Sequence, residues 1–207
     1  MLQGAFLPIE FLKEGLTKYK DWTAISDEEL NAFREDLTAI YTTFKKQKNP
    51  NEATTEEDLI IPVFQRLGFD DYLRQQTMAK KGRADVPDFL LFEDADHKQQ
   101  AVKEADDYKR FRHGLTILEA KAIDVHLDRK SSATNNRVPS NQILRYLPNA
   151  HTYSEYKIRF AVLTNGRHWR LYYMGATSKS EEFLEIDLGA VLGLEDYQAT
   201  LLSEVER

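Results

Sequence analysis

The apolar run Phe89–Phe92 is the feature that most constrains the fold. Four consecutive apolar residues leave neither face of a strand polar, and such a strand has to be covered on both sides. Segments of helical periodicity occur before and after this run, and they can supply the two covers. The sequence therefore predicts an α/β fold, with a short mixed central sheet flanked by helices.

Two helices are expected before this strand. Ser26 and Glu29 have the spacing of a capping box, and apolar residues recur at helical spacing from Leu30 to Phe44, with a stop at Pro50. A second helix is expected from about 51 to 67, followed by Gly68 as a left-handed cap. Residues 1–50 are therefore predicted to be a helical N-terminal extension, packed on a core domain of residues 51–190.

The rest of the chain alternates between short strands and helices. Asn165-Gly166 is the strongest hairpin signal and is expected to join two strands. Residues 191–207 are expected to form a C-terminal helix that leads to a further domain. The strands are expected near 73–77, 86–92, 115–120, 158–164, 169–174 and, at the sheet edge, 183–188; the helical segments at 94–112, 142–147 and 194–205; and an irregular segment at 124–139.

Composition excludes several classes of protein. With no cysteine among 207 residues, the chain cannot form disulfides, thiolate zinc sites or a cysteine nucleophile. There is no apolar run long enough to cross a membrane, and the N-terminus lacks a basic region followed by an apolar stretch. A cytoplasmic protein without a membrane partner is the expectation.

The net charge of −6 is unevenly distributed. Residues 126–170 contain eight lysines and arginines against two acids, whereas residues 85–107 contain eight carboxylates against two lysines. A charge run is usually a solvated surface, and this asymmetry alone decides nothing. It is nevertheless compatible with a basic surface that binds phosphates.

Three charged residues interrupt apolar strands. Glu119 and Lys121 are two residues apart on one strand, so their side chains share a face, and their neighbours are apolar. Asp88 follows a proline at the start of another apolar strand. A Glu–Lys ion pair is the simplest explanation of the first two, but three charges at one core edge are hard to explain as packing.

Magnesium is the economical way to hold Asp88 and Glu119 together, because it prefers hard oxygen ligands and keeps several waters. The carbonyl of Ala120 is a candidate for a further ligand. Lys121 would then orient a water or stabilise charge that develops on phosphorus.

The pattern of Pro87-Asp88 on one strand and Glu119-Ala120-Lys121 on the next resembles the signature of the PD-(D/E)xK nuclease superfamily. Further segments, in the same order, resemble the nuclease domains of type I restriction subunits, at their N-terminal region, and of type IIG restriction-modification enzymes. These segments are Asn51–Phe69, Gln142–Tyr146, and Leu163–Gly166 with Trp169 and Tyr172.

The resemblance implies roles for individual residues. Asp88 and Glu119 would be metal ligands, Lys121 the catalytic lysine, Glu52 the acidic residue of the opening helix, and Gln142 a residue that positions Lys121 or a phosphate. Glu56 lies one turn after Glu52, and a swap between these two acids stays open. The acidic insertion at 94–112 departs from the family pattern and puts in doubt the spacing between Asp88 and Glu119.

Candidate phosphate contacts come from the basic segment. Arg129, Lys130 and Arg137 lie in a loop rich in serine, threonine and asparagine after the strand that carries Glu119, and Arg145 lies on the next helix. The five histidines show no metal-ligand spacing and are interpreted as core or surface residues.

The function predicted from these features is that of a Mg²⁺-dependent DNA endonuclease domain of a restriction-modification system, with Mn²⁺ as a substitute ion. The alternative is a catalytically silent module of the same fold that binds nucleic acid or acts as a scaffold. The sequence has no phosphate-binding glycine loop, nucleophile elbow or methyltransferase motif. Methylating and target-recognising parts are therefore expected elsewhere, and a transient homodimer is expected where both strands are cut.

Overall fold

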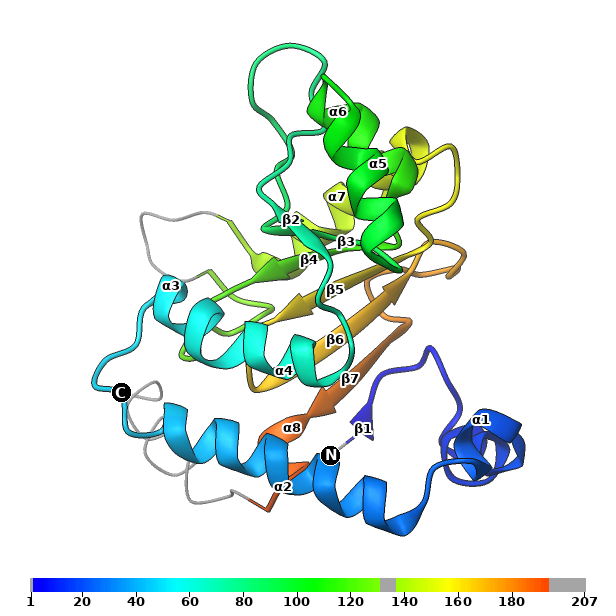
Figure 1. The fold of residues 1–207 in the computed structure, drawn as a ribbon, viewed down its shortest axis with the longest axis vertical. Helices are drawn as coiled ribbons and strands as arrows, with labels where there is room; N and C mark the ends of the chain where they lie inside the picture. The colour runs from blue at the N-terminus through cyan, green and yellow to red at the C-terminus, as the bar shows by residue number, and fades with distance from the viewer. Residues whose placement is uncertain (1, 131–136, 194–207) are drawn as a thin grey trace.

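The computed structural model describes residues 2–130 and 137–193 (Figure 1). Within them, seven strands form one sheet in the order β1-β7-β6-β5-β4-β3-β2. The strands are β1 (Leu2–Gln3), β2 (Tyr72–Arg74), β3 (Phe89–Leu91), β4 (Thr116–Ala120), β5 (Phe160–Thr164), β6 (His168–Tyr173) and β7 (Phe183–Asp187). The helices are α1 (Lys20–Thr23), α2 (Asp27–Phe44), α3 (Glu52–Thr55), α4 (Ile61–Arg66), α5 (Ala95–Lys103), α6 (Asp107–Arg110), α7 (Pro139–Tyr153) and α8 (Leu188–Val191).

The sheet is mixed, as the sequence predicts. Strands β4 and β5 are parallel, and each of the other neighbouring pairs is antiparallel. A parallel pair needs a crossover connection, and α7 lies in the chain between β4 and β5. The predicted α/β class, with helices on both sides of a short sheet, is confirmed.

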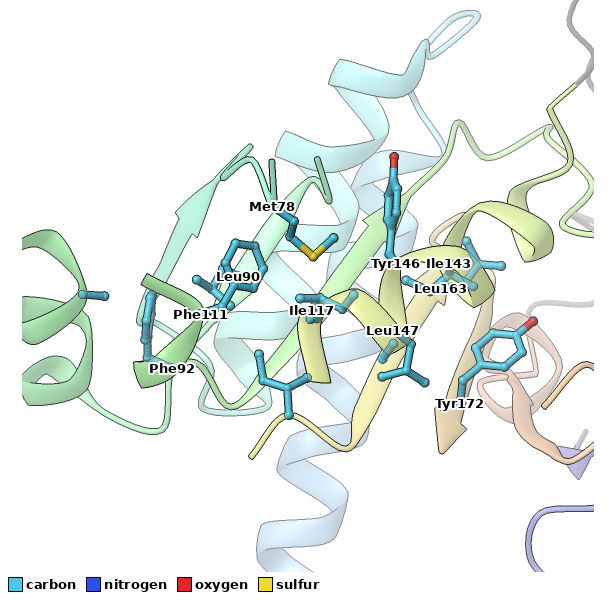
Figure 2. Packing of buried hydrophobic residues seen from close by; sticks show 14 of the residues in the cluster. Met78, Leu90, Phe92, Phe111, Ile117, Ile143, Tyr146, Leu147, Leu163 and Tyr172 are labelled. Atoms are coloured by element: carbon cyan, nitrogen blue, oxygen red, sulfur yellow. The ribbon is translucent and has the colours of Figure 1, made fainter. Parts of the chain in front are cut away.

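One face of the sheet packs against α7. Leu90 of β3, Ile117 of β4 and Leu163 of β5 meet Ile143 and Leu147 of α7 in the largest core cluster (Figure 2). The strand period of two sends every second residue of β4 to this face. Ile117 therefore defines the face on which Glu119 and Lys121 follow.

The other face packs against the helices of residues 27–66. Phe89, Leu118 and Ala120 point to this side, where they contact Ile60 and Phe64. The complete burial of β3 and β4 confirms that Phe89–Phe92 is covered twice. Figure 1 shows α3 and α4 running across the front of the sheet.

The helix expected from 51 to 67 is present but not uniform. Between α3 and α4, residues Glu56–Ile60 form a π-helical turn, in which the Ile61 amide donates to the Glu56 carbonyl. Pro62 has no N–H to donate to the carbonyl of Asp58, and this loss permits the wider turn. The helix ends at Gly68, whose φ is +86° as expected for a left-handed cap.

The N-terminal segment is more closely tied to the sheet than a helical extension alone. The capping box of Ser26 and Glu29 opens α2 as predicted, and Leu37 and Phe44 of α2 pack against the helix of residues 52–66. In addition, Leu2–Gln3 pair with β7. The prediction of β7 as the edge strand is therefore wrong, because β1 lies outside it.

The Asn165-Gly166 hairpin is present with Gly166 at a φ of +86°. The Asn165 side chain accepts hydrogen bonds from the amides of Arg167 and His168, which fixes the turn. The predicted helix at 194–205 lies outside the described residues, as does most of the segment 191–207. No helix among the described residues is both long and apolar enough to span a bilayer.

Candidate functional site

The sheet register brings Asp88 next to Glu119. Phe89 pairs with Leu118 in antiparallel register. Asp88, the residue before β3, therefore lies beside Glu119 of β4. The insertion at 94–112 forms α5 and α6 beyond the opposite end of these strands, and the register is kept. The long insertion between Asp88 and Glu119 therefore does not prevent these two residues from lying side by side.

The three charged residues form a compact group. Lys121 Nζ lies 2.6 Å from Glu119 Oε1 and 4.0 Å from Asp88 Oδ2. The Ala120 amide donates to Asp88 Oδ2 at 2.8 Å, which fixes the Asp88 carboxylate against β4. Side-chain exposure is 2% for Glu119, 13% for Lys121 and 16% for Asp88, so the group is buried at its base and open on one side.

Helix α7 contributes Gln142 to the same group. Gln142 Nε2 donates to Glu119 Oε1 and lies 2.9 Å from the hydroxyl of Tyr146, one turn further along the helix. Ile143, the next residue, is fully buried in the core and fixes the rotation of α7 that turns Gln142 toward the sheet. Gln142 and Lys121, which were predicted to lie near each other, thus both bind Oε1 of Glu119.

Two further acids are Glu52 of α3 and Glu56, the first residue of the π-helical turn that follows α3. Oxygen atoms of Glu52, Glu56 and Asp88 all lie within 4.8 Å of one another. Glu56 also forms an ion pair with Arg74 of β2, which binds Glu57 as well. Glu52 lines the cleft described below, whereas Glu56 is engaged by Arg74, and both acids stay candidates for the acidic residue of the opening helix.

A cleft of about 750 Å³ opens over these groups. Its lining includes five of the residues predicted to form the site, namely Glu52, Asp88, Glu119, Lys121 and Gln142. Arg137 and Arg145, two of the predicted phosphate contacts, line its wall. Arg83, Asp85 and Tyr146 also line the cleft and were not selected from the sequence.

Burial makes the negative charges of this cleft costly. Burial, together with the nearby charge of Asp88, raises the pKa of Glu119 to about 8, against the lowering effect of Lys121. Burial also raises the pKa values of Asp88, Glu52 and Glu56. For Lys121, burial lowers the pKa, but the charges of Glu119 and Asp88 outweigh it and raise the pKa. The site is therefore a place where added positive charge is favoured.

The donor set fits a hard divalent cation. The available ligands are carboxylate oxygens, which Mg²⁺ and Mn²⁺ prefer. Glu119 Oε2 is buried and has no hydrogen-bond partner in the described residues, which is unusual for a buried carboxylate. Oxygens of Glu52, Glu56 and Asp88 lie close enough together to share such an ion, whereas Glu119 is not part of that group, and Glu119 and the carbonyl of Ala120 stay predictions as further ligands.

The other predicted DNA contacts lie at different distances from the cleft. Arg129 and Lys130 are exposed in the segment after β4 and do not line the cleft. Arg145 is half-exposed at the rim and pairs with Asp85 at 2.8 Å. Arg170 is buried and pairs with Asp128 and Glu185, so the basic segment 126–170 does not form one DNA-facing surface.

Comparison with known proteins gives a family. Residues 18–204 match the model of the family described as "MmeI, N-terminal domain". No curated protein and no solved structure matches the chain. The family relates the domain to restriction enzymes. Because the match spans most of the chain, this protein belongs to the MmeI N-terminal domain family.

Proposed function

We propose that this domain is a Mg²⁺-dependent DNA endonuclease of the PD-(D/E)xK type and the cleaving part of a restriction-modification system. The observation that carries the proposal is the convergence of Asp88, Glu119 and Lys121 with Glu52 and Gln142 in one cleft. Asp88 precedes β3, Glu119 lies on β4 and Lys121 follows it, and Glu52 and Gln142 lie on α3 and α7. Packing of these elements alone does not require the five residues to meet. The family relationship to restriction enzymes supports the same conclusion.

Lys121 is assigned the role of electrostatic partner of the reacting phosphate. Water adds to phosphorus, the bond to one bridging oxygen breaks, and negative charge grows on the phosphoryl oxygens and on the leaving oxygen. The high pKa of Lys121, held up by Glu119 and Asp88, keeps its amine protonated for this task. It also lies where the cleft is open to a substrate.

Asp88, Glu119 and Glu52 are assigned to metal binding, with Mn²⁺ as a substitute for Mg²⁺. When bound, the ion would lower the pKa of water and polarise a phosphoryl oxygen. Gln142 holds Glu119 Oε1 through its side-chain amide, and Tyr146 in turn contacts Gln142. This arrangement fixes the orientation of the carboxylate, and within the described part of the chain Glu119 Oε2 has no hydrogen-bond partner.

The sequence-reading and methylating parts are proposed to lie on other domains or subunits, since the sequence carries no methyltransferase motif. A transient homodimer is proposed where both strands are cut, because the chain supplies one catalytic group. DNA is the proposed substrate, and the cations at the cleft wall, Arg137 and Arg145, are proposed phosphate contacts together with Arg129 and Lys130.

Metal binding provides the first test. Calorimetry with Mg²⁺ and Mn²⁺ is expected to detect binding to the wild type, weaker binding to Asp88→Asn, and unchanged binding to Asp36→Asn. Asp36 is a surface residue of α2 that pairs with Arg66 and controls for the loss of one carboxylate. A folded wild type that binds neither ion would instead support the silent scaffold.

Cleavage provides the second test. Plasmid DNA is incubated with the protein and Mg²⁺ or Mn²⁺, and with a chelator as control. Asp88→Asn and Lys121→Met are each expected to slow cleavage by about 10²-fold or more relative to the wild type. Cleavage at the wild-type rate by both variants would refute the assignment of the site.

A further inference from the structure

The segment between β2 and β3 is a basic arm, defined here as residues 78–85, that projects from the sheet (Figure 1). It carries Lys80, Lys81 and Arg83 around Gly82, whose φ is +74°. Lys81 and Arg83 are exposed, and Arg83 lines the cleft. The three charges lie just before the acidic segment that begins at Asp85, so a charge count over long windows hides them.

The cations of the basic arm are not neutralised. Among the described residues, no carboxylate lies within ion-pair distance of any of the three. Most arginines of the protein are paired with acids, namely Arg66, Arg74, Arg110, Arg112, Arg145, Arg167 and Arg170. Within residues 2–130 and 137–193, the side-chain hydrogen bond of Arg83 goes to the uncharged Gln75, at 2.9 Å, and Arg83 therefore keeps its full charge for an outside partner.

The base of the arm is held in a defined position. Thr77 Oγ1 lies 3.2 Å from the amides of Ala79 and Ala84 and donates to the Ala84 carbonyl at 3.0 Å, so it closes the arm at its neck. Gln75, which precedes the arm, and Asp85, its last residue, have φ values of +52° and +49°, a costly conformation that needs support from neighbours. The arm is thus built into the fold.

The arm also contacts helix α7, which carries Gln142. Asp85 accepts a hydrogen bond from Asn149 at 2.8 Å and forms an ion pair with Arg145 at 2.8 Å, and both partners belong to α7. On the other side, the Gln75 amide donates to the Asp88 carbonyl at 2.9 Å. The distance between the arm and the catalytic carboxylates is therefore set by direct contacts.

We propose that the basic arm grips the phosphate backbone of duplex DNA beside the phosphate that is cut, with Lys81 and Arg83 as the contacting residues. This inference rests on the proposed nucleic-acid substrate and adds the element that holds it. An acidic floor repels a polyanion, so cations fixed at the rim are needed to seat the backbone over it. Contacts of this kind position the duplex and carry no sequence preference.

The salt dependence of DNA binding tests this proposal. Fluorescence anisotropy with a labelled duplex, with Ca²⁺ in place of Mg²⁺, is measured from low to high salt. For the double variant Lys81→Ala/Arg83→Ala, the slope of log affinity against log salt is expected to fall by about 1.8. Affinity near 0.1 M salt is expected to fall on the order of tenfold to a hundredfold.

A matched control removes the same charge elsewhere. Lys18 and Lys20 are exposed, have the same spacing, and lie in the N-terminal helices far from the arm (Figure 1). Lys18→Ala/Lys20→Ala is expected to keep the wild-type slope. The charge-preserving variant Lys81→Arg/Arg83→Lys is also expected to keep most of it, which shows that the loss comes from charge and not from altered folding.

The outcomes separate this inference from the proposed nuclease. An unchanged slope in the arm variant, an equal loss in the control, or tighter binding of single-stranded RNA than of duplex DNA would each overturn the arm assignment. Calorimetry with Mg²⁺ is expected to give the same result for the arm variant as for the wild type. If the wild type binds no metal but the arm variant still loses duplex binding, the arm assignment stands and only the proposed nuclease activity is refuted.

Discussion

Lys121 Nζ lies 2.6 Å from Oε1 of Glu119, the residue two positions earlier at the C-terminal end of β4. This is the ion pair that the sequence alone offers as the simplest explanation for both charges. The pair does not account for the rest of the site, since Asp88 and Glu52 add negative charge beside it and Glu119 Oε2 has no partner in the described residues. The single positive charge of Lys121 does not balance the negative charges of Asp88, Glu119 and Glu52.

Replacement of Lys121 by methionine removes the charge and keeps the length of the side chain. We expect the single-turnover rate of DNA cleavage to fall by about 10²–10⁴-fold, as for other residues that stabilise or transfer charge in the transition state. Lys98→Met is the control, because Lys98 also pairs with an acid, Asp71 at 3.4 Å, but lies outside the cleft. Equal rates for the two variants would contradict the role of Lys121.

The stability of the metal-free protein is expected to depend on the ionisation of Glu119. Its carboxyl group keeps its proton up to a pKa of about 8 in the folded protein, against 4.5 in the unfolded chain. The raised pKa means that the folded state binds the proton more tightly. Its stabilising contribution is therefore complete below pH 4.5 and is lost as the pH rises to about 8.

Urea unfolding with a chelator present measures this effect. Between pH 5 and pH 8, the free energy of unfolding of the wild type is expected to decline by a few kcal/mol, on the order of 1.4 kcal/mol for each unit of pKa shift, relative to that of Glu119→Gln. Mg²⁺ is expected to restore the loss at pH 8, with release of protons on binding. Parallel pH profiles for the wild type and Glu119→Gln would contradict the interpretation.

Glu52 is expected to contribute more to metal binding than Glu56. Both lie near Asp88, but Glu56 is engaged by Arg74, whereas Glu52 lines the cleft. Glu52→Gln should therefore weaken Mg²⁺ binding in calorimetry by about tenfold or more, and Glu56→Gln by less. The opposite ranking would assign the opening-helix acid to Glu56. Glu57→Gln is a control, because Glu57 shares the contact with Arg74 but is exposed.

The central part of the site was predictable because it depends on short-range rules. Alternation along a strand puts Glu119 and Lys121 on one face, and the two buried strands leave few registers for Asp88. The helices were predictable from capping and periodicity, as at Ser26 and Glu29.

Other features depend on contacts between distant segments. The π turn at Glu56–Ile60, the pairing of Arg74 with Glu56, and the addition of Leu2–Gln3 to the sheet leave no periodic signal. The burial of Arg170 within the basic segment 126–170 was not predictable for the same reason. A count of charges does not tell a surface arginine from one such as Arg170, which is neutralised inside the fold.

Arg170 is expected to be a structural residue. It is 7% exposed and pairs with Glu185, which is 6% exposed, and with Asp128 at 2.6 Å. Arg170→Met leaves the Glu185 charge buried without its arginine partner, and the free energy of unfolding is expected to fall by about 3–5 kcal/mol.

The same variant separates stability from DNA binding. At a temperature where Arg170→Met is still folded, the salt dependence of its DNA affinity is expected to equal that of the wild type. Arg129→Met, from the same basic segment but exposed, is expected to behave in the opposite way, with stability within about 0.5 kcal/mol of the wild type and a slope reduced by about 0.9. A reduced salt slope for Arg170→Met would mean that Arg170 contacts DNA phosphates despite its burial. The DNA-binding surface of residues 126–170 would then include more of the segment than its ion pairs indicate.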